Sequence, residues 1–143
     1  MTDATPTPCP LPAPDDVSEF FWEGARKRRL LLQRCSSCSL LQYPPEVICI
    51  NCQSPRLEPT EASGRGTLYS YTVVERAFHV GFVDALPYVV ALIELDDQPG
   101  LKMLSNVVGI APRDLRVGMP LAVRFETRGD MVLPVFGPRA GSQ

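Results

Sequence analysis

The chain has 143 residues, 45% hydrophobic and 21% charged, and its 14 basic and 16 acidic residues give a formal net charge of -2. This length suits one compact domain or two very small ones, and it excludes a large multidomain enzyme. The near-neutral charge argues against a dedicated duplex nucleic-acid binder, which carries an excess of Lys and Arg to neutralise phosphates.

Residues 1–15 are expected to form a disordered, proline-rich arm. Five of the 15 prolines lie between Pro6 and Pro14, where they remove backbone donors and leave little to bury. The arm has neither the basic start nor the apolar stretch of a secretory signal. No apolar run in the chain reaches the ~18 to 20 residues that span a bilayer. We therefore expect a cytoplasmic protein that does not associate with membranes.

Residues 16–62 are predicted to form a helix followed by a metal-binding ribbon. The helix should start at Asp15 or Asp16, because acidic residues are favourable at a helix N-terminus. A basic run, Arg26 to Arg29, comes near its carboxyl end, where cations complement the helix dipole. Binding of an anion is the alternative role of this run. Leu30 to Arg34 is then expected to be a short strand.

Four of the five cysteines form the strongest chemical signal in the chain. Cys35-x2-Cys38 and Cys49-x2-Cys52 are two pairs, ten residues apart. Each pair can wrap as a tight knuckle, and two knuckles together complete a tetrahedral four-sulfur site. Zinc favours this closed geometry without redox cycling. Because all four positions are thiolates, no position stays open for water or substrate, and the predicted zinc is structural.

Other uses of these cysteines are weighed against zinc. A mononuclear iron site of the rubredoxin type has the same spacing and stays open as an alternative. Disulfides would suit a secreted protein, and a redox pair would need a thioredoxin-like βαβ context that is absent from the sequence. Cys9, in the arm, is expected to be a free thiol without a chemical role. Tyr43-Pro44-Pro45 should form a stiff turn that brings the second knuckle across the first.

Residues 63–138 are predicted to form a small β-barrel, followed by a tail at 139–143. Five β-like runs are separated by turn residues. They are Thr67–Glu75, Tyr88–Leu95, Leu101–Val108, Leu121–Glu126 and Met131–Val135. Five short antiparallel strands with one helical turn near Pro112 suit an OB-type barrel, and a small sandwich fits the periodicity almost as well. In the first run, alternation would place Thr67, Tyr69, Tyr71 and Val73 on one face.

Groups that could carry catalysis are scarce. His79 is the only histidine, and no cysteine outside the metal set and no serine elbow accompanies it, so a nucleophilic triad cannot be assembled. Exposed aromatic residues of an OB barrel can stack on single-stranded bases. Residues 64–137 hold seven basic and eight acidic residues, however, and a strand-binding groove needs a basic excess. Tyr69, Tyr71, Phe78 and Phe82 are therefore expected to pack within the barrel.

Several short motifs run along residues 16–138. They are Phe21–Gly24, Cys35–Cys38, Tyr43–Pro45, Cys49–Cys52, Gly64–Val74, Pro87–Leu95, Ser105–Gly109, Val117–Leu121 and Leu133–Phe136. In this combination the chain resembles the "domain of unknown function 35" family, in which a rubredoxin-like zinc ribbon precedes an OB-fold. The chain departs from the family at Ser39, where a glycine is common, and in its longer Asp97-Gln98-Pro99-Gly100 turn.

The resemblance implies a non-catalytic, zinc-containing accessory subunit that docks on and stabilises a thiolase-fold enzyme acting on acyl-CoA substrates. That enzyme would be a thiolase-like enzyme or aldolase subunit, such as a retro-aldolase of steroid side-chain degradation, in a hetero-oligomer with this chain. Acyl-CoA would then be bound through the complex, in which this chain would dock on the enzyme, stabilise it, or contact CoA and help to accommodate it. The alternative is a stand-alone OB-fold module for CoA or single-stranded nucleic acid, and the charge count speaks against nucleic acid.

Three stretches are the first places to look for contacts with a partner or with CoA. They are the basic run, the turn between the two knuckles, and the loops around the first barrel strand. The candidate residues are Arg28, Arg29, Tyr43, Pro44, Pro45, Arg65, Arg76, Phe78 and His79.

Overall fold

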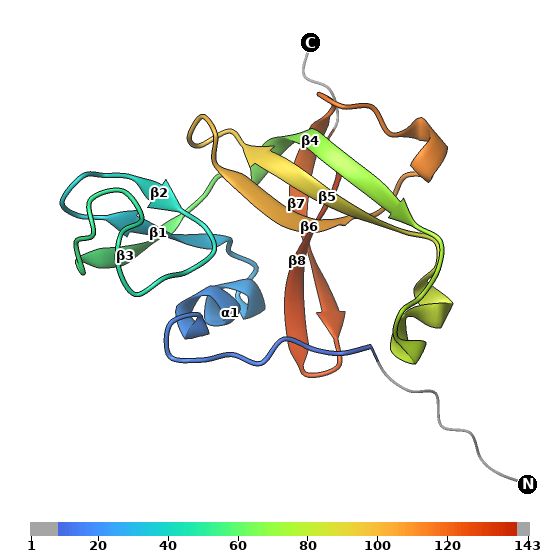
Figure 1. Cartoon of the computed structure of the whole chain (residues 1–143), viewed down its shortest axis with the longest axis horizontal. Coiled ribbons are helices and arrows are strands. Elements are labelled where there is room, and N and C mark those ends of the chain that lie inside the picture. The colour runs from blue at the N-terminus through green and yellow to red at the C-terminus, as the bar shows by residue number, and fades with distance from the viewer. Residues whose placement is uncertain (1–8, 140–143) are drawn as a thin grey trace, which may run out of the picture.

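A computed structural model describes residues 9–139 of the chain. Residues 1–8 of the expected arm and 140–143 of the expected tail lie outside the described residues. The chain forms a three-stranded ribbon sheet and a closed five-stranded barrel, with one α-helix beside both (Figure 1). The predicted fold class, a helix and four-cysteine ribbon followed by an OB-type barrel, is confirmed. Within residues 9–139, no helix is long and apolar enough to cross a membrane.

Helix α1 (Glu19–Arg26) begins later than the acidic residues suggested. Asp15 instead closes the turn that precedes the helix, because its Oδ1 accepts hydrogen bonds from the Ser18 hydroxyl and the Ser18 backbone N–H, both at 2.8 Å. These two bonds lower the pKa of the Asp15 carboxyl. The Asp15 carbonyl also accepts from the Glu19 N–H at 2.9 Å. Asp15 therefore stabilises the turn that precedes α1 and is not part of the first turn of the helix.

The basic run ends α1 in a Schellman motif. The Arg29 N–H donates to the Gly24 carbonyl at 2.8 Å, and the Arg28 N–H donates to the Ala25 carbonyl at 2.9 Å. Arg28 takes the left-handed position of this motif, with φ of 61°, where glycine is usual. Phe21 and Ala25 are buried and turn toward the barrel, because α1 packs against β8 (Met131–Pro138).

The ribbon sheet has the order β2-β1-β3. Its central strand β1 (Leu31–Cys35) pairs antiparallel with β2 (Leu41–Gln42) and with β3 (Leu57–Glu61). The β1 prediction is confirmed, whereas β3 was not predicted because Pro59 and its acidic neighbours obscure it. Proline removes a backbone donor, and a strand at the edge of a sheet tolerates that loss.

The barrel closes in the order β4-β5-β6-β8-β7. Its other strands are β4 (Arg65–Val74), β5 (Tyr88–Leu95), β6 (Lys102–Val107) and β7 (Pro120–Arg128). All five predicted barrel strands are present, and two 3-10 turns, η1 (Val80–Ala85) and η2 (Pro112–Asp114), join them. The expectation of purely antiparallel strands is wrong at the closure, where Val107 of β6 pairs with Phe136 of β8 in parallel.

A β-bulge in β4 overturns the predicted facing of its side chains. Leu68 pairs with Ile93 and Ser70 pairs with Leu92, so Tyr69 is an extra residue without a partner on β5. An extra residue moves the following side chains to opposite faces. Val73 consequently packs against the core while Tyr69 is 49% exposed. Tyr71 and Phe78 are also exposed, so the expectation that these aromatic residues pack within the barrel is wrong.

The turn between β5 and β6 connects the barrel to the ribbon. The side chain of Gln98 donates to the Leu41 carbonyl and accepts from the Leu41 N–H, both at 2.9 Å. The Asp97 carboxylate accepts from the Ser63 N–H and hydroxyl, also at 2.9 Å each. The longer turn that distinguishes the sequence therefore holds both the edge of the ribbon and the segment that leads into β4.

Candidate metal centre and partner surfaces

The four predicted ligands converge at the end of the ribbon. The sulfur atoms of Cys35, Cys38, Cys49 and Cys52 all lie within 4.8 Å of one another. The Cys35 and Cys52 sulfurs are 3.5 Å apart, and those of Cys38 and Cys49 are 3.6 Å apart. A tetrahedron of Zn–S bonds of ~2.3 Å has edges of about 3.8 Å. The donor set therefore fits a single tetrahedral metal ion.

The two knuckles share one backbone geometry. Ser37 and Cys38 donate their N–H groups to the Cys35 sulfur at 3.3 and 3.4 Å. In the second knuckle, Asn51 and Cys52 donate to the Cys49 sulfur at 3.4 and 3.5 Å. Each knuckle ends in a non-glycine residue with positive φ, at 67° for Ser39 and 64° for Gln53. The departure at Ser39 thus falls on a left-handed position that favours glycine.

These amide groups prepare the sulfurs for a cation. The Cys38 N–H is the largest of the influences that lower the pKa of Cys35, to about 6, and the Cys52 N–H lowers the pKa of Cys49 in the same way. The Ser54 amide lowers the pKa of Cys52, but the neighbouring sulfurs outweigh it and raise that pKa to about 12. Without a cation, the four thiols cannot all ionise together, whereas a bound zinc would stabilise four thiolates and hold the two knuckles together.

A buried glutamine pair, which sequence reasoning missed, supports the loop between the knuckles. Gln33 and Gln42 face each other across β1 and β2 and are 7% and 2% exposed. Gln42 Nε2 donates to Gln33 Oε1 at 2.9 Å and to the Ile48 carbonyl at 3.2 Å, and its Oε1 accepts from the Ile50 N–H at 2.9 Å. Gln33 Oε1 accepts from the Glu46 N–H, and Gln33 Nε2 donates to the Glu46 carbonyl, at 2.8 Å each. The pair therefore fixes the backbone on both sides of Cys49.

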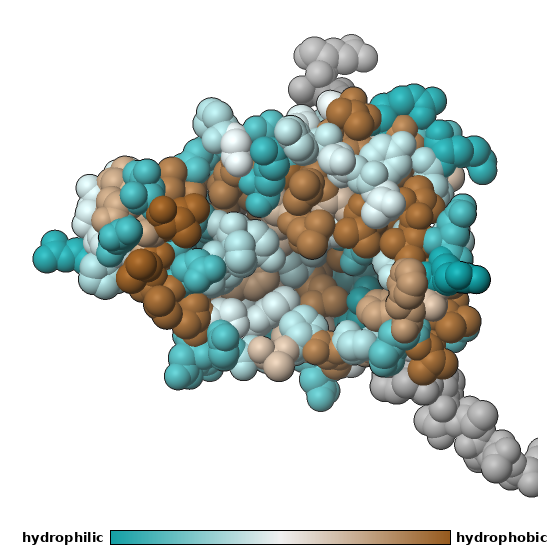
Figure 2. Space-filling view, viewed as in Figure 1, coloured by the Kyte–Doolittle hydropathy of each residue, from teal (hydrophilic) through white to brown (hydrophobic). Residues whose placement is uncertain are grey.

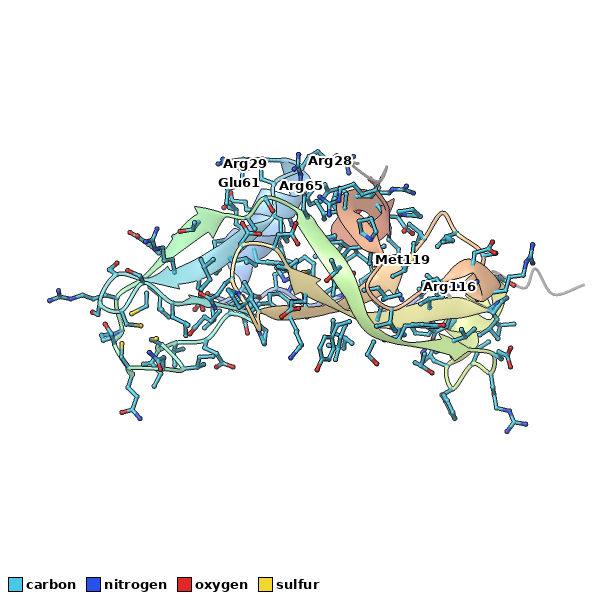
Figure 3. The ribbon with its side chains drawn as sticks, turned by 90° about the horizontal axis from the view of Figure 1, so that it is seen from above. Arg28, Arg29, Glu61, Arg65, Arg116 and Met119 are labelled. Carbon is cyan, nitrogen blue, oxygen red and sulfur yellow. The ribbon has the colours of Figure 1, made fainter. Side chains whose placement is uncertain are left out.

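Three of the candidate contact residues gather on one face, where the ribbon meets the barrel (Figure 3). Arg28 Nη1 donates to the Phe125 carbonyl of β7 at 2.9 Å, and the backbone of Arg65 lies opposite that of Ala122 on the same strand. Ala122 and Phe125 are three residues apart along β7, which is a distance of about 10 Å. Arg29 pairs with Glu61 at 2.8 Å, and both side chains are about half exposed. We name Arg28, Arg29 and Arg65 the basic strip.

Arg76, Phe78 and His79 lie elsewhere, in the loop that follows β4. Phe78 is 94% exposed, and Arg76 is exposed as well. His79 Nδ1 accepts the Gly81 N–H at 2.9 Å and so caps η1. The Nδ1 atom of the single histidine therefore has a local role in ordering this turn.

The turn between the knuckles is partly internal. The Tyr43 ring lies 5.5 Å from that of Phe21 in α1, and its burial raises the pKa of the Tyr43 hydroxyl. The Tyr43-Pro44 bond is cis, Pro44 is exposed and Pro45 is half-buried. Of these three candidates, Pro44 is therefore the most accessible to a partner.

An exposed apolar patch on the ribbon was also missed by sequence reasoning. Val47 and Ile50 are each 67% exposed and Ile48 is 42% exposed. Apolar side chains gather over the ribbon, at the left of the space-filling view (Figure 2). The segment Val47-Ile48-Cys49-Ile50 resembles a buried strand in sequence, so its exposure could not be read from the pattern. We name Val47, Ile48 and Ile50 the ribbon patch.

Comparisons with known protein families match both modules. Residues 22–58 match the model described as "ChsH2, rubredoxin-like zinc ribbon domain". Residues 59–126 match "ChsH2, C-terminal OB-fold domain". The four cysteines all fall in the zinc-ribbon match, and a zinc ribbon agrees with their geometry.

Relatives carry two kinds of name. The chain is 41% identical over 130 residues to a "Probable enoyl-CoA hydratase alpha subunit" of Thermomonospora curvata, covering 90% of this chain and 40% of that protein. It is 29% identical to the "3-oxo-4,17-pregnadiene-20-carboxyl-CoA hydratase alpha subunit" of Mycobacterium tuberculosis, covering 95% of this chain and 42% of that protein. The chain thus spans about two fifths of the length of these two relatives.

A "DUF35 domain-containing scaffold protein" of Methanocaldococcus jannaschii is 32% identical, with 73% of each chain covered. Among solved structures, a chain of "Ltp2-ChsH2(DUF35) aldolase" matches with a TM-score of 0.80 and 40% identity, covering 90% of this chain and 98% of that one. The family models match both modules, and the scaffold protein is matched over most of its length, so sequence and fold identify the same family. This protein belongs to the DUF35 family, as a chain that joins a ChsH2-type zinc ribbon to an OB-fold.

Proposed function

We propose that this chain is a non-catalytic, zinc-containing accessory subunit that docks on and stabilises a thiolase-fold enzyme acting on acyl-CoA substrates. The partner is a retro-aldolase of steroid side-chain degradation. One observation carries the proposal. A chain of the solved "Ltp2-ChsH2(DUF35) aldolase" is 40% identical to this chain and matches its fold with a TM-score of 0.80. The name of that aldolase gives two components, one of which is a DUF35 protein.

The chemistry of the chain supports a role without catalysis. The four thiolates would use every position of a tetrahedral zinc, so the metal would have no site for substrate. His79 is committed to the cap of η1. Within residues 9–139 we find no nucleophile paired with a base, so the partner must supply the reacting groups.

Two apolar surfaces suit the docking of a protein. Phe78 is an aromatic side chain that is 94% exposed on a loop of the barrel, and aromatic anchors carry a large share of binding energy at protein interfaces. The ribbon patch is held in place by the buried glutamine pair and the metal site, so little conformational freedom is lost when it binds. We propose that both surfaces contact the aldolase.

The basic strip is the proposed contact for CoA. Phosphate groups bind guanidinium groups through charge-assisted hydrogen bonds, and the exposed Arg65 side chain forms no ion pair within the described residues. Replacing Arg65 with alanine should weaken CoA binding to the complex in calorimetry. The matched control is Arg113→Ala, which removes an exposed arginine on the distant turn η2.

Coexpression with a thiolase-fold aldolase of the same organism tests the docking proposal. We expect a stable heteromer in size-exclusion chromatography with light scattering, and an aldolase that is insoluble or inactive when expressed alone. Phe78→Asp and Ile50→Asp should each weaken the heteromer at least tenfold. The control Val117→Asp replaces an apolar residue with the same 67% exposure as Ile50 and should have no effect. An aldolase equally soluble and active alone would refute the proposal.

One observation favours the alternative function, which is binding of single-stranded nucleic acid by the barrel, and that function can be tested. Tyr69 is exposed on the outside of the barrel, with the Lys102 ammonium 4.2 Å from its ring centroid, and such a pair can stack on a base and bind a phosphate. Filter binding with short oligonucleotides distinguishes the two functions. Submicromolar affinity with a steep salt dependence, lost in Tyr69→Ala, would favour a nucleic-acid module over the accessory subunit.

A further inference from the structure

A cavity of about 680 Å³ opens at the end of the barrel where η1 lies. In Figure 1, η1 is the yellow-green turn at the lower right, away from the ribbon. Its volume falls in the ~300 to 1,000 Å³ range of pockets that accept drug-sized molecules. The cavity contains none of the cysteine ligands, none of the basic strip and none of the ribbon patch.

The walls of the cavity are mainly apolar and one of them is aromatic. Val89 and Val107, which are 3% and 5% exposed, line it from neighbouring barrel strands. Phe82 of η1 and Tyr88 of β5 stand beside each other, with ring centroids 5.6 Å apart and an interplanar angle of 34°. Ile110, in the segment that follows β6, also lines the cavity. Such surfaces favour a flat, apolar molecule, which gains contact area against the rings.

Two residues of the lining, Asn106 and Tyr88, carry polar side-chain atoms that could bind a ligand oxygen. The Asn106 side chain is held in place because its Nδ2 donates to the Val89 carbonyl at 2.9 Å. Its Oδ1, and the hydroxyl of Tyr88, form no hydrogen bond with the described part of the chain. A hydroxyl group of a ligand could donate to Asn106, and a ketone could accept from Tyr88.

The charges on the cavity walls select against anions. Its charged residues are Asp84, Glu126 and Arg128, so two carboxylates oppose one guanidinium. Arg128 already donates to Glu126 at 3.1 Å. An anionic ligand would therefore meet a net negative site, and the phosphates of CoA belong at the basic strip instead. A neutral ligand escapes this repulsion.

We propose that this cavity binds a neutral, flat, mainly apolar molecule that carries a hydroxyl or ketone oxygen. The ring body would lie against Phe82 and Tyr88, and its oxygen would bond to Tyr88 or Asn106. The proposal goes beyond docking on an enzyme, because it assigns a ligand site to this chain itself. It rests on the cavity alone, so it can fail while the heteromer forms, and the heteromer can fail while the ligand binds.

Progesterone, a neutral four-ring ketone, is the probe, and NMR of the 15N-labelled full chain with zinc is the assay. We expect saturable shifts of the Val89, Val107 and Gly109 amides, with no shifts at the cysteine knuckles. A typical binding energy per atom for a probe of this size gives a Kd on the order of 10 µM. A steroid carboxylate with the same rings should bind at least tenfold more weakly, and Glu126→Gln should narrow that difference.

Two tryptophan variants in η1 distinguish loss of binding through filling of the cavity from loss of binding through disruption of the turn. Ala85 lines the cavity and is exposed, so Ala85→Trp should fold and weaken progesterone binding at least tenfold. Val83 lies two residues earlier, is 52% exposed and is not part of the lining, so Val83→Trp should bind normally. Tyr88→Phe should weaken binding about fivefold through the loss of one hydrogen bond. Absence of shifts at saturating progesterone, unchanged binding by Ala85→Trp, or equal binding of the carboxylate would each overturn the proposal.

Discussion

Replacing Gln42 with methionine should destabilise the ribbon, because this side chain joins two strands to the loop that carries Cys49. The substitution keeps a side chain of similar volume, so the cavity contribution is small. It removes three hydrogen bonds, to Gln33, to the Ile48 carbonyl and from the Ile50 N–H. At ~1 kcal/mol for each bond, we expect the free energy of unfolding to fall by about 2 to 3 kcal/mol.

Urea unfolding in saturating zinc measures this loss, and transfer of zinc to a coloured chelator measures its effect on the metal site. Zinc should leave the Gln42→Met protein faster, because the backbone on either side of Cys49 is no longer held. A double-mutant cycle with Gln33→Met isolates the pair. The five bonds of the network include one shared by both glutamines, so the double mutant should lose about 1 kcal/mol less than the sum of the single mutants.

Two results would refute this reasoning. One is a loss below about 0.5 kcal/mol for Gln42→Met, which is the size of an ordinary surface substitution. The other is full additivity of the two glutamine substitutions, since residues that share a hydrogen bond should not act independently.

Three further outcomes follow from the metal site. Cys49→Ser should lose the metal and unfold the ribbon, seen by elemental analysis and circular dichroism. Cys9→Ser is its control and should keep one ion per chain, while full metal content in Cys49→Ser would contradict a four-thiolate site. Ser39→Gly should stabilise the protein by about 1 kcal/mol in thermal unfolding, because glycine pays no left-handed penalty, and Ser39→Ala should bring no gain. Since the pKa of Cys35 is lowered to about 6, zinc binding at pH 7.5 should release fewer than four protons. Calorimetry in several buffers should show this number rising as the pH falls through 6, with weaker zinc binding; a constant four would contradict the shift.

The metal site could be predicted from sequence because its geometry is local. Two residues between paired cysteines allow a single knuckle turn, and ten residues between the pairs allow the second knuckle to return to the first. The barrel strands were likewise visible, because alternation and turn residues act over a few positions. The family was predicted from the combination of motifs, and the two matched family models confirm it.

Other features depend on residues far apart in the sequence. The face on which Val73 lies depends on a bulge that exists only in the pairing with β5. β3 exists because Pro59 can take an edge position beside β1. Gln98 bonds to Leu41, 57 residues away, and nothing in its own neighbourhood indicates that contact.

The sequence by itself determined the metal-binding chemistry and the strand content of this protein: four cysteines at the spacing of a single metal site, and five strands long enough to close a small barrel. Only the tertiary structure decided which surfaces are available for binding. The basic strip and the cavity beside η1 each combine residues from separate elements. The ribbon patch and Phe78 each lie within one loop, and they are exposed because no other element of the described chain covers them. Local sequence determines backbone conformation, whereas strand register and the packing of the ribbon on the barrel determine which side chains meet and which remain exposed to solvent.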